Sequence, residues 1–444
     1  MKICLVSKIL HISLQMKRII YSTLFFTVFL FSGCKKDTPQ NIVHTIDPSV
    51  QFTANTFNDL YLWYESMPAV DLTTIKTPDD YINKVRYIKD RWSFTMTYTD
   101  MVNLLDNGQT TGWGAGMGFD DLNLLRIQFV YDNSAMGKAG VKRGWQIKAM
   151  NGKTIASMSD AEVNTALNNA GNSFVFIKND GSETTIQLTQ GAIVINSVQY
   201  SGIFPRGAKK IGYLVFSDFL GSSVKELNSV FDGFLSQGVT DLILDLRYNG
   251  GGTLDCADSL VAMLAGKPNI GKVYNTLTYN NKHIRMGYQS LIGLKSNSVQ
   301  LDKLVVITTS STASASELVI SGLKPYMNMK LIGSTTHGKP VGMNIEGDTK
   351  LNIAIAPISF RNVNSQGYSD YFDGIPVDFA VKDNVTQDWG NPADACLTAA
   401  LNYISLGAIG SINIKSAIIP GRIIYKGTDH PVENLYQSGN KPVQ

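Results

Sequence analysis

Apolar and polar residues are distributed along this chain in blocks that predict strands and helices in alternation. Between residues 207 and 405, short continuous apolar runs are followed by segments in which apolar residues recur every three or four positions. Continuous runs are typical of buried strands, and the three-to-four spacing is typical of amphipathic helices. The expected strands cover residues 211–216, 239–246, 304–307 and 331–332, and the expected helices cover residues 224–235, 255–264, 318–323 and 394–404. Repeated alternation of this kind indicates an α/β core built in layers.

Two regions upstream of this core have different patterns. Residues 51–106 are rich in aromatic residues, and apolar positions between 81 and 92 continue at helical spacing, so we expect a small helical N-terminal domain. Residues 110–192 contain shorter apolar runs, with Asn151-Gly152 placed for a hairpin turn and one expected helix at 160–170. This pattern predicts a small β domain inserted before the core.

The first 34 residues have the pattern of an export signal. Met16-Lys17-Arg18 begins a positively charged region, an apolar run follows from Ile19 to Phe31, and Ser32-Gly33-Cys34 comes next. The apolar run is too short to span a membrane and fits a signal peptide that starts at Met16. The end of this segment resembles a bacterial lipobox, in which the cysteine is lipidated, although Phe31 stands where leucine is usual. The alternative is an ordinary signal peptide in which Cys34 occurs by chance.

Lipidation of Cys34 would attach the chain to the cell envelope, at the periplasmic or the outer face of a bacterial outer membrane. Residues 35–50 are polar, and we expect them to form a tether. The tail, residues 406–444, has strand-like patches and no role that its pattern reveals.

The composition excludes some partners. With 44% hydrophobic and 17% charged residues among 444, the chain has enough apolar material for several globular domains. A net charge of +3, with no run of Lys or Arg outside the N-terminus, argues against nucleic-acid binding. Cys256 and Cys396 fall in expected helices, where we expect free buried thiols. No Cys/His cluster has the spacing of metal ligands, so we expect neither a metal nor a cofactor.

Ser314-Ala315-Ser316-Glu317 stands where an apolar strand leads into an expected helix. The N-terminus of a helix has unpaired backbone N–H groups and a dipole that favours negative charge, so it can stabilise an oxyanion. The alternative is that Ser314 and Ser316 only cap the helix. Arg247-Tyr248-Asn249-Gly250-Gly251-Gly252 follows another buried strand, and its glycines allow a backbone N–H to point into a cleft. The Lys-Ser/Thr of a P-loop is missing, which argues against a phosphate site.

These two stretches, together with Gly338-Lys339, resemble the C-terminal processing (tail-specific) peptidase family. The resemblance covers most of residues 55–405, and its members are serine–lysine endopeptidases whose core resembles the ClpP/crotonase fold. It implies that Ser314 is the nucleophile, that Lys339 is the general base, and that Gly251 and Ala315 supply the oxyanion hole. A lysine has a reference pKa of about 10.4, so its surroundings must lower that pKa before it can act as a base near neutrality.

One position departs from the family pattern. Members often carry a glutamine four residues after the lysine, and this chain has Met343 there. His337, two residues before Lys339, is the alternative base, because Ser–His pairing recurs on many folds. We expect Glu317 to pair at the helix start rather than act as an acid. We expect Arg247 and Asn249 to brace the glycine loop rather than contact substrate, and Asp245, at the end of a buried strand, to have a structural role.

Residues 110–192 resemble a PDZ domain. Its carboxylate-binding loop would be Gly116-Met117-Gly118-Phe119, where a peptide adds as a strand. Trp145 stands where this pattern usually has aspartate, and a β domain without a ligand is the alternative. The resemblances together imply an exported serine endopeptidase that acts on proteins or peptides and binds substrate tails with its PDZ domain. The alternative function is a lipid-anchored peptide-binding protein that has lost cleavage. A crotonase-type acyl-CoA enzyme fits poorly, because export separates it from CoA.

Overall fold

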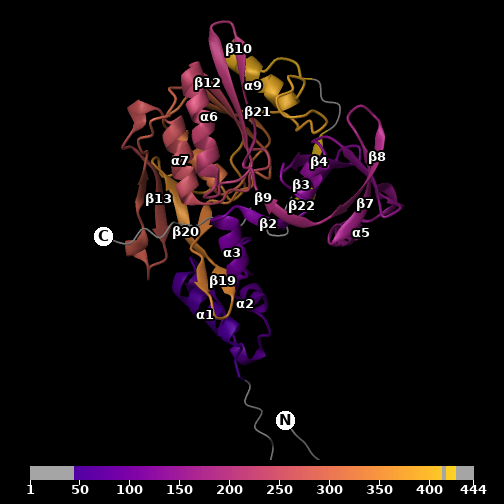
Figure 1. Ribbon diagram of the computed structural model, residues 1–444. Helices are drawn as coiled ribbons and strands as arrows, with labels where there is room; N and C mark the ends of the chain where they lie inside the picture. Colours follow the sequence, from indigo (N-terminus) through magenta and orange to yellow (C-terminus); the bar gives the residue numbers. More distant parts are fainter. Residues whose placement is uncertain (1–44, 413–416, 427–444) are drawn as a thin grey trace, which may run out of the picture. The chain divides into compact units, whose positions relative to one another are not determined.

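A computed structural model describes residues 45–412 and 417–426 of the chain (Figure 1). The expected signal peptide and Cys34 lie outside these ranges. Within the described ranges, none of the helices combines the length and the apolar character needed to cross a membrane.

A six-stranded sheet lies at the centre of the core. Its order is β10 (Val198–Arg206), β11 (Lys209–Phe216), β12 (Asp241–Asp245), β15 (Lys303–Thr308), β16 (Met329–Gly333) and β21 (Phe379–Ala380). The β10–β11 pair is antiparallel and the other pairs are parallel. The predicted start of the core at residue 207 is therefore wrong, because β10 is hydrogen-bonded to the core sheet and begins at Val198.

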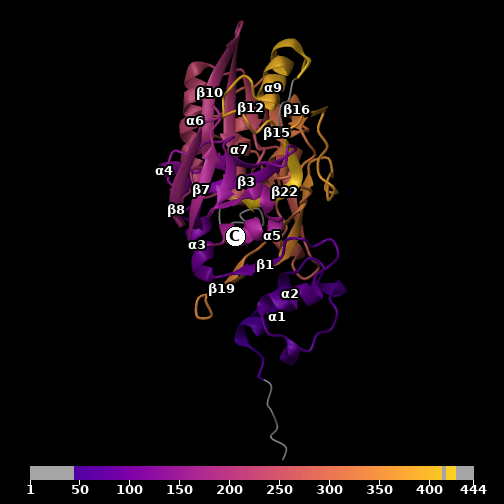
Figure 2. The same cartoon turned by 90° about the vertical axis from the view of Figure 1, so that its right-hand side faces the viewer.

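Helices cover both faces of this sheet, which is why β12 and β15 are almost entirely buried. One face packs against α6 (Ser223–Gln237), α7 (Leu254–Leu264) and α8 (Ala315–Leu323), and the other packs against α9 (Ala395–Leu406) (Figures 1 and 2). Successive side chains of a strand point to opposite faces, so Leu242 and Leu244 contact the first layer and Ile243 the second. The predicted layered α/β core is confirmed. Cys256 and Cys396 are buried on opposite faces as free thiols.

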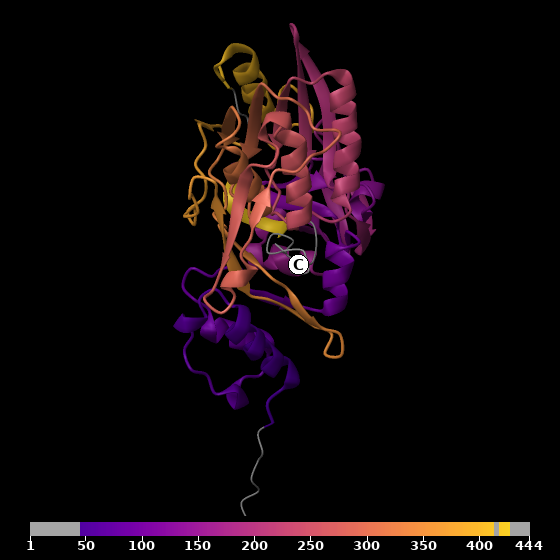
Figure 3. The same cartoon turned by 90° about the vertical axis from the view of Figure 1, so that its left-hand side faces the viewer.

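Two smaller sheets connect the core to the N-terminal helices. The first has the order β14 (Gln289–Leu291), β13 (Val273–Tyr279), β20 (Ile358–Asn364) and β17 (Val341–Met343), and the second has the order β1 (Phe94–Met96), β19 (Ile353–Ala356) and β18 (Glu346–Asp348). Helices α1 (Pro48–Leu60) and α2 (Pro78–Val85) pack against β17, β19 and β20, and Figure 3 shows these indigo helices beside orange strands. A third helix, α3 (Tyr98–Leu105), follows β1.

Two expectations for this N-terminal region are wrong. Helix α1 begins at Pro48 after the N-cap Asp47, so the last residues of the predicted tether are helical. Helix α2 ends at Val85, and Ile88 is exposed, so the helical spacing read from 81 to 92 does not correspond to one helix. Trp92 therefore lies in a connecting segment, where its indole N–H reaches His337. His337 belongs to residues 334–340, between β16 and β17, which we call the lysine loop because they contain Lys339.

The insertion domain comprises residues 109–194. Strands β2 (Gln109–Gly112) and β9 (Gly191–Val194) pair at its base. Between them lie β3 (Ala115–Asp120), β4 (Leu125–Val130), α4 (Ala135–Lys138), β5 (Gln146–Met150), β6 (Lys153–Thr154), α5 (Asp160–Leu167), β7 (Gly171–Ile177) and β8 (Glu183–Thr189). The sheet has the order β22, β3, β4, β5, β7, β8, with β22 (Ile418–Lys426) supplied by the C-terminal region.

The predicted carboxylate-binding loop, Gly116 to Phe119, lies inside β3 and is a strand. The preceding turn contains Gly112 and Gly114, whose φ angles are 140° and 75°. These angles favour glycine, so the sharp change of direction occurs before the predicted loop.

Candidate active site

Ser314 forms the turn between β15 and α8. It is the N-cap of α8, as the sequence indicated, and its φ of 57° and ψ of −114° are unusual for a residue with a side chain. Such a conformation costs on the order of 1–3 kcal/mol and persists only where the surroundings enforce it. The Ser314 side chain is fully buried, yet its Oγ has no hydrogen-bond partner among the described residues. A strained serine with an unpaired hydroxyl is therefore presented at a helix N-terminus.

The glycine loop packs directly against this serine. Gly251 has a φ of 106°, and a Cβ at this position would lie 2.7 Å from the Ser314 Cβ, so only glycine fits. The Asn249 carbonyl accepts hydrogen bonds from the Ala313 N–H (3.0 Å) and the Ser316 Oγ (3.1 Å), which confirms the bracing role expected for Asn249.

The Gly251 N–H is already occupied in this arrangement. It donates to the Asn249 Oδ1 at 2.8 Å. The oxyanion role expected for Gly251 therefore requires this bond to open. The Ala315 N–H, by contrast, donates to no acceptor among the described residues, as expected at the first position of a helix.

A buried ion-pair network holds the strand that leads into the glycine loop. The Arg247 guanidinium donates to Asp245 (2.7 Å), Asp383 (2.7 Å) and Asp394 (2.9 Å), and Arg143 also pairs with Asp383 (2.9 Å). Burial lowers the pKa of Arg247, but the carboxylates of Asp245, Asp394 and Asp383 outweigh it and hold the pKa well above its usual value. The network confirms that Asp245 and Arg247 are structural, and Asp394 also caps α9 through the Leu397 N–H.

Glu317 joins the serine turn to the lysine loop. Its Oε2 accepts hydrogen bonds from the Ser314 N–H (3.0 Å) and the Lys339 N–H (2.8 Å), and its Oε1 accepts from the Gly338 N–H (2.7 Å) and the Thr336 Oγ1 (2.5 Å). Burial raises the pKa of this carboxyl, and the four donors oppose that rise. The sequence indicated pairing at the helix start. The link to Lys339 was missed, because it spans 22 residues.

Lys339 is fully buried beside residues of the N-terminal region. Its Nζ lies 6.0 Å from the centroid of the Trp92 ring. The Arg91 guanidinium donates to the carbonyls of Gly338 (3.0 Å) and Phe372 (2.9 Å). Gly338 has a φ of 91°, and a Cβ there would lie 2.3 Å from the Phe372 carbonyl oxygen. Arg91 and Trp92 therefore position the lysine loop, and no local pattern in the sequence identified them.

The surroundings of His337 argue against a role as base. The Trp92 Nε1–H donates to the His337 Nε2 at 3.1 Å, and the His337 Nδ1 lies 3.2 Å from the Ser310 carbonyl oxygen. Because a carbonyl can only accept, the proton is on Nδ1, and the Nε2 lone pair is taken by Trp92. Neither nitrogen is left to accept a proton from Ser314.

Met343 packs in the core. It is fully buried in an apolar cluster with residues of α1, α2 and β20, including Phe57, Tyr61 and Ile358. At this position the chain has an apolar contact with the N-terminal helices instead of the amide that family members often carry.

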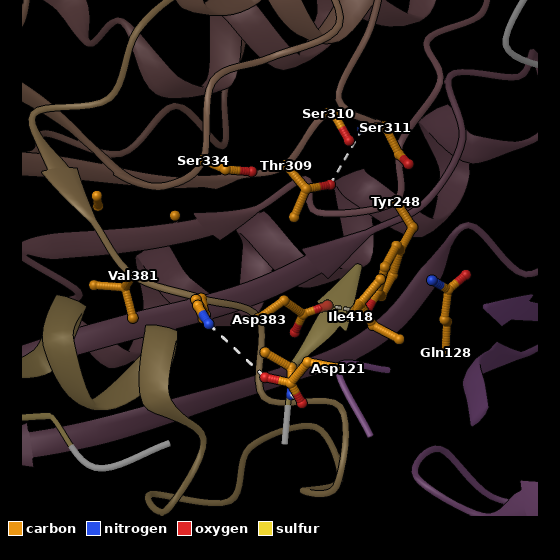
Figure 4. Close-up of a pocket in the computed structure, with 14 residues that line it drawn as sticks. Asp121, Gln128, Tyr248, Thr309, Ser310, Ser311, Ser334, Val381, Asp383 and Ile418 are labelled. Atoms are coloured by element: carbon orange, nitrogen blue, oxygen red, sulfur yellow. Dashed lines mark hydrogen bonds and ion pairs between the residues drawn. The ribbon is translucent and has the colours of Figure 1, made fainter. Parts of the chain in front are cut away.

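A pocket of about 420 Å³ lies beside the serine turn (Figure 4). Its wall includes Thr309, Ser310 and Ser311 before the turn, Asp383 from the ion-pair network, and Ile418 at the start of β22. Ser314 and Lys339 are not part of this wall. The pocket therefore adjoins the candidate site and does not contain it.

Comparisons with known proteins show which family the chain resembles. Residues 210–369 match Peptidase family S41, and residues 51–94 match the Peptidase S41 N-terminal domain. The chloroplastic C-terminal processing peptidase of Tetradesmus obliquus is 26% identical over 217 residues, 46% of this chain and 45% of that protein. The carboxyl-terminal-processing protease of Synechocystis is 26% identical over 323 residues, 70% of this chain and 73% of that protein. The chain thus spans about half of the length of the algal relative.

A solved structure shares the fold. The crystal structure of an S41 protease from Bacteroides fragilis aligns with a TM-score of 0.67 and 24% identity, covering 80% of this chain and 97% of the other. The family match covers the serine turn, the glycine loop and the lysine loop. The chain is therefore similar to the S41 peptidases over the regions that contain these three motifs.

Proposed function

We propose that this protein is a serine endopeptidase that cleaves peptide bonds with Ser314 as nucleophile and Lys339 as general base. One observation carries the proposal. A fully buried serine hydroxyl stands at a strained helix N-terminus and has no hydrogen-bond partner within residues 45–412 and 417–426. A single carboxylate, Glu317, links the backbone of this serine to that of a fully buried lysine.

The chemistry is acyl transfer in two steps. The Ser314 Oγ attacks the carbonyl carbon of the substrate while its proton passes to the neutral Lys339 amine, and the leaving amine receives that proton when the peptide bond breaks. Water then hydrolyses the acyl-enzyme by the reverse proton path. The Ala315 N–H and an N–H of the glycine loop stabilise the oxyanion, and one such donor is worth roughly 10²–10³ in rate. For Gly251 this role requires exchange of its bond to Asn249.

We also propose that the insertion domain binds extended peptides, as PDZ domains do. The support is that β3 is the edge of the domain's own strands, and that α5 packs in the same domain core. A peptide added to such an edge gains backbone hydrogen bonds along its length.

A second candidate function is peptide binding without cleavage. Two observations favour it: Ser314 and Lys339 are both fully buried, and Met343 packs as an apolar residue. In this candidate function the serine turn has only a structural role, and the insertion domain binds other proteins without cleaving them.

Cleavage of an unfolded protein distinguishes the two candidates. We expect the parent chain to cleave it, and Ser314→Ala and Lys339→Ala each to lower the rate by at least about 10³-fold, because paired residues act as a unit. Surface changes Ser236→Ala and Lys330→Ala are the matched controls and should cleave at the parent rate. His337→Ala should retain activity. If the parent leaves the substrate intact, the binding candidate stands. If cleavage survives Lys339→Ala but is lost in His337→Ala, the base is the histidine.

The location of the chain is a separate proposal. We propose that Cys34 is lipidated and anchors the protein to the cell envelope, and the support is the charged, apolar and small-residue order of residues 16–34. Fractionation of cells that express the parent chain and Cys34→Ala tests it. The parent is expected with the membranes and the variant in the soluble fraction, and equal distribution would contradict the anchor.

A further inference from the structure

A segment of the C-terminal region completes the sheet of the insertion domain. Strand β22 pairs antiparallel with β3, with Ile418 opposite Asp120, Ile423 opposite Gly118 and Lys426 opposite Gly116. The two strands lie side by side in Figures 1 and 2. Without β22, β3 would be an open edge strand, and such edges are templates for pairing with another chain.

β22 also contacts α5, so this one segment lies against both the edge strand β3 and the helix α5. We call the position of β22, paired with β3 and in contact with α5, the β3–α5 groove. A peptide added to the edge of this domain would lie in the same place. The occupant here is about 250 residues further along the chain than α5.

The start of this segment is attached at both sides. The Asp121 N–H donates to the Ala417 carbonyl (2.7 Å), and the Ala417 N–H donates to the Asp121 Oδ1 (3.0 Å). The Ile418 N–H donates to the Asp383 carbonyl of the core (3.2 Å). Ala417 and Ile418 also form part of the wall of the 420 Å³ pocket (Figure 4). The segment thus contacts the insertion domain and the core at the same point.

The pairing that follows is irregular. Its register shifts between Ile418 and Ile423, so five residue steps of β22 span only two steps of β3. Pro420 and Gly421 lie in this interval, and proline cannot donate to a strand ladder. An interrupted ladder has fewer backbone bonds to lose when the segment leaves.

We propose that residues 417–426 are a resident peptide ligand of the insertion domain, held in the β3–α5 groove in cis, and that extended apolar peptide segments of substrates compete for the same groove. A tethered ligand competes at an effective concentration in the millimolar range, so it excludes weak ligands and yields to tight ones. The inference rests on the proposed peptide-binding role of the insertion domain and is independent of cleavage.

The test measures binding of a labelled peptide to chains that all carry Ser314→Ala, so that the probe is not cut. The probe is a fluorescein-labelled peptide with the sequence of residues 415–428, followed by anisotropy. A chain ending at residue 412, after α9, is expected to bind it with a Kd at least tenfold lower than the full-length chain. The same peptide with Ile423→Pro should bind more weakly to the shortened chain.

A second pair of variants covers the case in which the shortened chain does not fold. In the full-length chain, Ile423→Pro should weaken the cis pairing and increase probe binding, whereas the matched control Ile423→Val should bind like the parent. Hydrogen exchange should show that the amides of residues 116–120 lose protection in the shortened chain and regain it when the peptide is added.

Equal affinity of the full-length, shortened and Ile423→Pro chains would overturn the inference, as would binding that leaves the amides of residues 116–120 unprotected. Cleavage by the Ser314 form is measured separately. If the Ser314 form does not cleave but removal of residues 417–426 increases peptide binding, only the proposal of cleavage fails. If the Ser314 form cleaves but peptide affinity is the same with and without these residues, only the present inference fails.

Discussion

The serine turn and the β3–α5 groove each bring together segments that are distant in sequence. Different kinds of hydrogen bond hold the two regions together. The serine turn donates buried hydrogen bonds to the Asn249 carbonyl of the glycine loop, and the Glu317 carboxylate accepts bonds that join the turn to the lysine loop. The groove is filled by β22 through backbone pairing that is interrupted near Pro420.

This difference determines what each region can do. A buried donor or acceptor that loses its partner costs about 1–3 kcal/mol, so the serine turn cannot rearrange without losing several such contributions at once. Backbone pairing at a sheet edge can be exchanged for equivalent bonds with another strand, at little net cost. The turn is therefore suited to hold Ser314 in its strained conformation, and the groove is suited to exchange the proposed ligand.

The largest expected effect is on the buried network behind the glycine loop. Arg247→Met would leave Asp245 without a cation and leave Asp383 and Asp394 with Arg143 alone. Loss of one partner of a buried pair costs about 3–5 kcal/mol. Urea denaturation should show this loss in the free energy of unfolding. Arg206→Met, at an exposed position, is the matched control. A loss below about 1 kcal/mol for Arg247→Met would remove the contrast between a rigid turn and an exchangeable groove.

The second effect concerns the contact between the insertion domain and the core. The Tyr131 hydroxyl donates to the Asp218 Oδ2 at 2.9 Å, and burial raises the pKa of Asp218 to about 6, against hydrogen bonds from Ser217 and Tyr131 that lower it. The folded state therefore keeps this proton longer than the unfolded state. The stability contributed by protonated Asp218 is fully present below about pH 4 and is lost as the pH rises through 6.

Asp218→Asn removes this titration. Relative to the parent, the variant should gain up to about 3 kcal/mol of stability between pH 4 and pH 7, measured as the difference between the two urea-unfolding profiles across that range. Asp302→Asn, whose side chain is exposed, is the matched control. A difference profile for Asp218→Asn that does not change with pH would show that this carboxyl does not titrate there.

The third effect tests whether Glu317 positions the serine turn and the lysine loop for the reaction or contributes to substrate binding. In Glu317→Gln, either orientation of the amide places an NH₂ group against two of the four donors, so the backbone of Ser314 or Gly338 loses its acceptor. We expect kcat to fall by about 10²-fold, roughly 2.7 kcal/mol, with KM little changed. Glu226→Gln is matched, because its carboxylate also accepts two backbone N–H groups but contacts neither loop. An equal fall in both variants would indicate a general loss of stability.

The smallest effect tests what holds β22 in place. Lys382 is mostly exposed, and its Nζ lies 3.8 Å from the Asp121 Oδ2. Exposed ion pairs contribute little, so Lys382→Ala should change the free energy of unfolding by less than about 0.5 kcal/mol and probe binding by less than twofold. A larger gain in probe binding would mean that charge, rather than backbone pairing, holds the segment near the groove.

Much of the site could be predicted because its parts are local. The turn at Ser314 depends on a strand, small residues and a helix within about twenty positions, and the glycine loop follows its strand directly. Both lie where the sequence indicated. The structural roles of Asp245, Arg247 and Asn249 followed from their place at the end of a buried strand.

By itself, the sequence determined the order of elements, the layered core and the three motifs, because periodicity and turn chemistry act over a few residues. Only the tertiary structure decided the partner of Trp92, which is 245 residues away in His337, the hydrogen bond that occupies the Gly251 N–H, and the pairing of β22 with β3. These contacts depend on how whole elements pack, and no local pattern encodes them. The sequence alone could not assign a role to the tail, because the role of β22 depends on the sheet edge with which it pairs.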